Sequence, residues 1–446
     1  MLYRWFLKNF LKRDSNLKCF NIFNFARPFY DLNLLPLSKI LERKFYPELN
    51  KNSALFSMKN LKIAISGYGS ISALGIDRES IWNNYQDNRH CFQREQMINK
   101  PEWLARLSNE AQERINGLTK EKKYQHLDPS VLYAIAASRI AVKQAGWNTG
   151  EGFAVNMGSS RGATLSFEKY HSEFRESAQQ KVNPMTSPGT TLGNIASWVA
   201  CDQNVSGPVI SHSATCSTAL QSIANAAAWL HAGFCTRFLA GGSEAPLTPF
   251  TVAQMKALKI YSASDQDYPC RSMDLNKEQN TLILGEGAAC FCLELNSENP
   301  LGFITGIGMG TEIISHGASL SANADCLQKS MLMAIQGHEP GTVDAVIMHS
   351  PGTLLGDNSE MIAIEAIFGR DKPLLTGNKW KIGHTFGASG ALSLEMALLM
   401  LKHNQFIQVP YLTQQKQQKP LKKILINAAG FGGTAFSIIL ENNPQN

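Results

Sequence analysis

The sequence lacks the features that would place the chain among membrane-spanning or disordered proteins. No stretch of its 446 residues approaches the ~20 consecutive apolar residues that a membrane-spanning helix needs. Charged residues make up only 17% of the chain and hydrophobic residues 44%, which excludes a disordered or low-complexity protein. We therefore expect a folded chain with a sizeable core and no membrane span.

Cysteine is sparse, and the main body has no excess of either charge. The nine cysteines are odd in number and irregularly spaced, so we expect a reducing compartment, the cytoplasm, and no disulfide framework. Residues 1–57 hold ten Lys and Arg against four Asp and Glu, which leaves 32 of each sign for residues 58–446. The main body therefore gives no reason to expect nucleic-acid binding.

The first 57 residues differ from the rest of the chain. The opening MLYRWFLKNFLKR interleaves basic and aromatic residues, as in a helix on a membrane surface, and lacks the apolar segment of a signal peptide. Met58 then directly precedes a strand pattern. We interpret residues 1–57 as an N-terminal extension, either disordered or an over-extended start. A membrane-surface anchor and a partner-binding arm remain alternatives.

Two segments of the main body echo each other. Residues 61–69 read LKIAISGYG and residues 301–310 read LGFITGIGMG, and we interpret each as an apolar strand closed by glycines in a tight turn. Strands and apolar helices alternate after each segment, and residues 129–146 and 217–233 form the clearest helices. The pattern predicts an α/β protein of two similar halves, residues 58–299 and 300–446.

Cys216 is the candidate nucleophile. It lies in SHSATCSTALQS, between a predicted strand ending near Ser211 and a predicted helix from Ser217. The free N–H groups and the dipole of a helix N-terminus favour the nucleophilic thiolate, and the same N–H groups can stabilise an oxyanion. The alternative is a small core residue packed beneath a strand.

Two histidines of the second half are candidate partners of this cysteine. His349 ends the predicted strand DAVIM, and His384 lies in the Gly-rich segment GNKWKIGHTFGASG. Neighbouring glycines leave room for a substrate to approach either side chain. Each histidine could also be a buried structural residue.

Three further motifs have weaker support. GSSRG at residues 158–162 matches the nucleophile elbow of hydrolases, with Ser160 as the nucleophile. Gly67 and Gly69 half-match a dinucleotide-binding loop that lacks its third glycine. Cys290 and Cys292 share one face of a strand without a second Cys/His pair, so we expect them in the core and expect no metal site.

Taken together, the segments resemble the β-ketoacyl-(acyl carrier protein) synthase family of the thiolase superfamily, from about Lys59 to Leu440. The motifs that carry the resemblance are ATCSTA at 214–219, GGSEA at 241–245, the histidine segment 349–360, the Lys–x4–His segment 379–390 with GHxxGAxG, and GFGGT at 430–434. The resemblance implies a thiolase-like α/β fold in which two βαβαβαββ halves form a five-layered αβαβα sandwich.

The resemblance also implies a role for each matching residue. Cys216 would accept the acyl group, and His349 and His384 would complete the Cys-His-His set of the elongating, decarboxylating branch. Lys379 matches the family's lysine near the second histidine. Phe431 matches the gating phenylalanine, whose N–H would form the oxyanion hole together with that of Cys216.

The implied reaction is acyl transfer followed by decarboxylative condensation with a malonyl thioester. Acyl carrier protein would be the partner, Thr353 would bind its pantetheine arm, and Asp357 and Glu360 would support the site. The resemblance implies a homodimer or a heterodimer with a related subunit, and no cofactor. The alternative is a non-catalytic, chain-length-determining subunit of a heterodimeric ketosynthase.

Four departures separate the chain from the usual family pattern. Pro351 replaces a pantetheine-binding threonine, Ser393 replaces a glutamate that partners the lysine, and Ala429 replaces a second gating phenylalanine. The Arg-Pro-Phe-Asp stretch reads RSMD at 271–274, without the Arg-Asp-Gly-Phe that usually follows. The chain is thus similar to synthases of bacterial polyene-pigment or other secondary acyl pathways.

Overall fold

One mixed sheet runs through the described part of the chain. The computed structural model describes residues 61–97, 99–150, 152–317, 320–413 and 415–443. The strands that the first half contributes to this sheet are β1 (Ile63–Ser72), β4 (Ala154–Gly158), β5 (Val209–Ile210), β6 (Arg237–Glu244) and β8 (Gly287–Glu294). Those of the second half are β9 (Gly302–Thr311), β10 (Ala345–Ile347), β11 (Leu374–Thr376), β12 (Lys423–Gly430) and β13 (Thr434–Glu441).

The strand order is symmetric about the middle of the sheet. It runs β11-β10-β12-β13-β9-β1-β8-β6-β4-β5, and the halves meet where β1 pairs antiparallel with β9, Ile63 opposite Ile304. On each side the next two pairings are antiparallel and the last two are parallel. The sequence echo between residues 61 and 301 thus marks a structural repeat.

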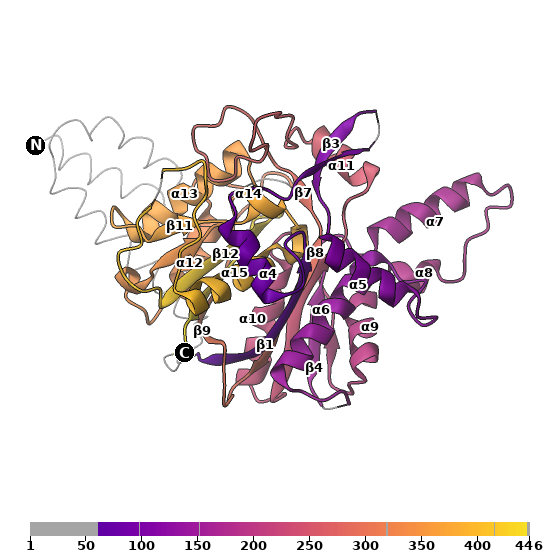
Figure 1. Cartoon of the computed structure of the whole chain (residues 1–446), viewed down its shortest axis with the longest axis horizontal. Helices are drawn as coiled ribbons and strands as arrows, with labels where there is room; N and C mark the ends of the chain where they lie inside the picture. Colours follow the sequence, from indigo (N-terminus) through magenta and orange to yellow (C-terminus); the bar gives the residue numbers. More distant parts are fainter. Residues whose placement is uncertain (1–60, 98, 151, 318–319, 414, 444–446) are drawn as a thin grey trace, which may run out of the picture. The chain divides into compact units, whose positions relative to one another are not determined.

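Helices cover the sheet in layers (Figure 1). The helices that bury the outer face of the first half are α5 (Asn109–Thr119), α6 (Pro129–Ala145) and α9 (Asn194–Gln203). Those on the outer face of the second half are α12 (Asp325–Ala334) and α13 (Leu354–Phe368). Two central helices, α10 (Thr218–His231) and α15 (Ser389–His403), share one core with the inner faces of both halves. The predicted αβαβα sandwich is confirmed.

Smaller elements lie around these layers. They are the helices α4 (Arg78–Gln86), α7 (Thr164–Glu176), α8 (Thr186–Thr190), α11 (Pro249–Ala257) and α14 (Lys379–Ile382), the 3₁₀ turns η4 (Pro340–Thr342) and η5 (Phe386–Ala388), and a separate sheet of β2 (Gln93–Gln96), β3 (Pro101–Ala105) and β7 (Leu284–Gly285). Figure 1 shows α7 and α8 extending away from the main sheet. Within the described residues, no helix has the length and apolar character needed to cross a bilayer.

The tight turn predicted at Gly67 and Gly69 is wrong, because both glycines lie inside β1. A Cβ on Gly67 would lie 2.6 Å from the carbonyl oxygen of Ala141 in α6. The second half repeats this arrangement, since a Cβ on Gly308 would overlap the carbonyl oxygen of Ser330 in α12. The glycines let each outer helix lie directly on the strand backbone. The dinucleotide-loop interpretation is also wrong, because Gly67 and Gly69 lie in a strand and not in a loop.

Some helix boundaries follow capping signals that the sequence carries. α6 begins after Asp128, whose side chain accepts from the Ser130 amide, and ends at Gly146 with a φ of 66°. α13 begins at Leu354, where the Thr353 hydroxyl caps it by accepting from the Gly356 amide. The prediction for residues 1–57 lies outside the described residues.

The glycine contacts predict a specific sensitivity of the fold. Gly308→Ala should lower the free energy of unfolding by about 2 kcal/mol or more, because the new methyl group meets helix backbone that cannot give way. Gly341→Ala is the matched control, since its Cβ would meet nothing within 4 Å. Urea unfolding of both variants tests this expectation, and equal midpoints would show that α12 does not rest on β9.

Candidate active site

The candidate site residues follow the ends of strands from both halves. Cys216 follows β5, His349 follows β10, Lys379 follows β11 and Phe431 follows β12. β5 pairs in parallel with β4, and β10 pairs in parallel with both β11 and β12. Only the pairing of β12 with β13 is antiparallel among the pairings that these four strands make. Ligands of α/β sheets characteristically bind beyond the carboxyl ends of such strands.

Cys216 stands directly before α10, as predicted. Ser217 is the N-cap residue of that helix, and the Cys216 side chain is buried, with 5% exposure. The backbone amides of Cys216 and Phe431 both lie within hydrogen-bonding reach of the Cys216 sulfur. The structure therefore brings together the two N–H groups that were expected to form an oxyanion hole.

The prediction that this environment favours the thiolate is wrong for the resting protein. Burial raises the pKa of the Cys216 thiol to about 12, and the buried Glu244 carboxyl group raises it further. Lys379 and the two backbone amides act in the opposite direction without overcoming burial. At neutral pH, Cys216 is therefore a protonated thiol that must lose its proton as it attacks.

His349 and His384 lie beside each other. Their ring centroids are 5.2 Å apart, and the rings are nearly perpendicular. The His349 amide donates to Glu360 (2.9 Å), and the buried Nδ1 of His349 has no hydrogen-bond partner among the described residues. His384 Nδ1 lies 2.9 Å from the Ser389 hydroxyl, and the His384 amide donates to the Ile283 carbonyl (2.7 Å). The Ser389 hydroxyl thus orients the His384 ring, while Glu360 holds the backbone of His349.

Both histidines are neutral at pH 7. Burial lowers the pKa of His384 to about 3, with a smaller contribution from the charge of Lys379. Burial also lowers the pKa of His349 well below its usual value, and Lys379 and His384 add to this effect. A neutral imidazole both accepts a proton and donates a hydrogen bond, so the pair can serve either half of an acyl-transfer reaction.

Lys379 is a buried ammonium group without a hydrogen-bond partner in the described part of the chain. Burial lowers its pKa to about 8, while Glu360 and Cys216 act in the opposite direction. Ser393, at the position of the family's glutamate, has a hydroxyl that likewise finds no partner in the residues that the structure describes. Glu395 faces elsewhere and accepts from Ser70 in β1. Within the described residues, neither Ser393 nor Glu395 forms a hydrogen bond with Lys379.

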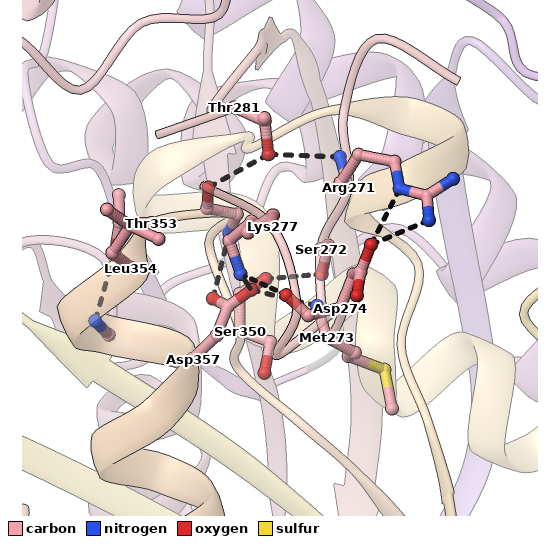
Figure 2. Close-up of polar contacts among 12 residues, drawn as sticks. Arg271, Ser272, Met273, Asp274, Lys277, Thr281, Ser350, Thr353, Leu354 and Asp357 are labelled. Carbon is pink, nitrogen blue, oxygen red and sulfur yellow. Dashed lines mark hydrogen bonds and ion pairs between the residues drawn. The ribbon is translucent and has the colours of Figure 1, made fainter. Parts of the chain in front are cut away.

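Glu360 accepts from the amides of His349 and Ser350, and Asp357 holds the segment that follows, with its contacts shown in Figure 2. Asp357 Oδ2 accepts from Lys277 Nζ and from the Met273 amide, both at 2.8 Å, and Oδ1 accepts from the Gly352 amide at 3.0 Å. The Lys277 and Asp357 side chains are 3% and 0% exposed. This buried ion pair joins residues 273–277 to the histidine segment.

A polar cavity lies beside this ion pair. Its volume is about 850 Å³, and its lining includes Arg271, Lys277, Thr281 and Tyr411. The Thr281 hydroxyl donates to the Gly352 carbonyl (2.9 Å), as Figure 2 shows. The cavity is therefore adjacent to the segment in which Thr353 caps α13.

Glu244 is a site residue that the sequence analysis missed. Its buried carboxyl group accepts hydrogen bonds from the Ser159 hydroxyl (2.7 Å) and from the amides of Ser160 (2.8 Å), Arg161 (3.1 Å) and Gly387 (2.9 Å). The available signal was an acidic residue in the otherwise small GGSEA motif. Glu244 therefore holds the GSSRG segment in place. These contacts give the segment a structural role and make a role of Ser160 as a hydrolase nucleophile unnecessary.

Two other expectations concern buried residues. Cys290 and Cys292 lie fully buried in β8, and the described residues contain no cluster of three or more potential metal ligands. Ala429 is 6% exposed and packs in the core beneath α12 and α13.

A buried thiol at a helix N-terminus, two neutral histidines and two converging amides define a thiol-dependent acyl-transfer site. Sequence models of the β-ketoacyl synthase N-terminal and C-terminal domains match residues 60–299 and 301–412. The chain belongs to the β-ketoacyl synthase family.

Curated relatives of similar length carry the name 3-oxoacyl-[acyl-carrier-protein] synthase 2. The protein from Staphylococcus aureus is 25% identical over 404 residues, which cover 84% of this chain and 97% of that protein. The protein from Coxiella burnetii is 24% identical over 413 residues, covering 86% and 99%. The similarity therefore extends over both halves of the fold.

Solved structures show the same fold at lower sequence identity. A β-ketoacyl synthase from Burkholderia phymatum aligns with a TM-score of 0.74 and 22% identity, covering 86% of this chain and 99% of that one. A ketosynthase in complex with its chain length factor from Xenorhabdus doucetiae aligns with a TM-score of 0.72 and 20% identity, covering 86% and 98%. The thiolase-like fold is thus confirmed independently of the motifs.

The unpartnered ammonium group predicts that Lys379 destabilises the fold. A base whose pKa falls on folding binds fewer protons in the folded state, so the stability of the wild-type protein should rise between pH 8 and about 10.5. Lys379→Met should raise the free energy of unfolding by about 1–3 kcal/mol at pH 7, and the gain should shrink towards pH 10.

Urea unfolding at pH 7 and pH 9 tests this expectation. The control is Lys122→Met, which changes an exposed lysine and should alter stability little at either pH. A Lys379→Met variant less stable than the wild type at pH 7 would mean that the ammonium group has a stabilising partner.

Proposed function

We propose that this chain is an elongating β-ketoacyl-(acyl carrier protein) synthase that extends an acyl chain by two carbons. The observation that carries the proposal is that Cys216, His349 and His384 are all buried and all lie within range of the Lys379 charge, in a chain that belongs to the β-ketoacyl synthase family. The curated relatives named 3-oxoacyl-[acyl-carrier-protein] synthase 2 support it. The activity is that of an acyltransferase.

In the first half-reaction, the Cys216 sulfur attacks the carbonyl carbon of an acyl thioester on the carrier protein. A neutral histidine takes the thiol proton as the bond forms, because the raised pKa of Cys216 leaves little free thiolate. The backbone amides of Cys216 and Phe431 hold the negative oxygen of the tetrahedral intermediate. The carrier thiol then leaves with the proton, and the acyl group remains on Cys216.

In the second half-reaction, a malonyl thioester loses CO2 and becomes an enolate. Neutral His349 and His384 donate hydrogen bonds to the developing negative oxygen. The enolate carbon attacks the acyl group on Cys216, the carbon–sulfur bond breaks, and the β-ketoacyl product leaves on its carrier. The Cys216 sulfur recovers a proton, and no cofactor or metal enters these steps.

The proposed partner is acyl carrier protein. One structural neighbour is a ketosynthase in complex with an acyl carrier protein of a type II polyketide synthase, at a TM-score of 0.74 and 18% identity. The polar cavity lined by Lys277 and Thr281 offers hydrogen-bonding groups for a pantetheine arm near Thr353. With Pro351 in place of a second threonine, Thr353 would be the hydroxyl that this segment retains for the arm.

We also propose that the protein works as a dimer in the cytoplasm. The edge strand β5 leaves Val209 42% exposed, and α7 exposes Leu165 and Phe167, which would give a second subunit apolar surface to cover.

The state of the cysteines supports the proposed location in the cytoplasm. In the described part of the chain all cysteines are free, which is the usual state in a reducing compartment.

A non-catalytic, chain-length-determining subunit is the second candidate. The structural neighbour from Xenorhabdus doucetiae pairs a ketosynthase with such a chain length factor. Retention of Cys216 beside two histidines favours the catalytic role for this chain. Its departures from the family pattern at Pro351 and Ser393 support a secondary acyl pathway, such as one producing polyenes, over housekeeping fatty-acid synthesis.

The two histidines and the cysteine should affect different steps of the reaction. Cys216→Ala should abolish condensation while leaving thermal unfolding unchanged, since it removes the nucleophile and little volume. His349→Ala and His384→Ala should slow CO2 release from malonyl-carrier protein at least 100-fold and acylation of Cys216 less, because both rings stabilise the enolate.

Single-turnover acylation and release of labelled CO2 measure the two steps separately. Condensation by the Cys216→Ala protein would overturn the proposed function. Normal CO2 release with slow acylation in both histidine variants would instead assign the rings to the first half-reaction.

A further inference from the structure

The residue before the nucleophile has an unusual backbone conformation. Thr215 has a φ of 51°, in the left-handed region that β-branched residues rarely occupy. Its hydroxyl donates a hydrogen bond of 3.1 Å to the carbonyl oxygen of Phe431. The side chain next to Cys216 thus reaches the gating turn at residues 430–434, which comes from the other half of the chain.

The turn is built to receive this contact. A Cβ on Gly430 would overlap the Thr215 hydroxyl and would lie 2.9 Å from the carbonyl oxygen of Ala214. The close approach of the two loops therefore requires glycine at position 430. At the far end of the turn, the Gly433 carbonyl accepts from the Glu312 amide at 3.0 Å. The turn is thus hydrogen-bonded to other segments on each side of Gly432.

Phe431 connects the hydrogen bond with the chemistry of the site. Its amide points at the Cys216 sulfur, while its carbonyl accepts from Thr215. Fixing the carbonyl limits rotation about the Phe431 backbone, and therefore limits the directions that its amide and its 38% exposed ring can take. Gly432 and Gly433, with φ of 92° and 67°, would let the turn move once the bond breaks.

We propose that Thr215 is a positioning residue that latches the gating turn. Its hydroxyl holds the Phe431 amide towards the reacting carbonyl oxygen, so that the oxyanion hole is complete before substrate arrives. Opening of the turn requires this hydrogen bond to break. The inference rests on the proposed function, because it assigns Thr215 a role in acyl transfer to Cys216.

The test compares the wild-type protein with three variants at position 215. Thr215→Val keeps the shape and removes the hydroxyl, and Thr215→Gly removes the hydroxyl while relieving the left-handed backbone. Both should lower kcat for acylation by about fivefold or more, with KM for the acyl-carrier protein unchanged within twofold. Thr215→Ser retains a hydroxyl and should stay within twofold of the wild type.

Thr119→Val is the matched control. It removes an exposed threonine hydroxyl that also donates to a backbone carbonyl, that of Asn116, at 3.0 Å. This variant should acylate at the wild-type rate. Because glycine tolerates a positive φ, Thr215→Gly keeps the comparison decisive even if Thr215→Val fails to fold.

The outcomes separate the latch from the proposed function. No acyl group on wild-type Cys216 would contradict the proposed function itself. Normal acylation by both the wild-type and the Thr215→Gly proteins would overturn the latch alone. A Thr215→Ser protein as slow as Thr215→Gly would also overturn it, since the effect would then not depend on the hydroxyl.

Discussion

The antiparallel pairing of β1 with β9 is the constraint on which the rest of the structure depends. It joins two half-sheets that have the same succession of antiparallel and parallel pairings. Helices α10 and α15 lie in one core that both half-sheets share. The first half then supplies Cys216 at the start of α10, and the second supplies His349, His384 and Phe431. Neither half holds the complete site, so the chemistry depends on how closely the halves pack.

Burial sets the electrostatics of the assembled site. It raises the pKa of Cys216 and lowers the pKa values of His349, His384 and Lys379, so each group is pushed towards its neutral form. The resting thiol and imidazoles are therefore uncharged, and charge separates only as a histidine takes the thiol proton during attack. Helix dipole and backbone amides therefore matter most in the transition state, where charge develops.

The sequence predicted the repeat and the helices at residues 129–146 and 217–233, because periodicity and caps are local signals, and it singled out Cys216, His349 and His384 as candidate site residues. It did not predict that the glycines of β1 lie under α6, or that Glu244 accepts four hydrogen bonds from two loops. Those contacts join segments far apart in the chain. The resting state of Cys216 was mispredicted, because the cost of burial depends on everything packed around the thiol.

Mass spectrometry of the intact chain, followed by peptide mapping, tests the central claim most directly. After incubation with an acyl-loaded carrier protein, the account predicts a mass increase of one acyl group, located on Cys216. The Cys216→Ala protein should remain unmodified. An unmodified wild-type chain, or an acyl group on Ser160 in place of Cys216, would contradict the account.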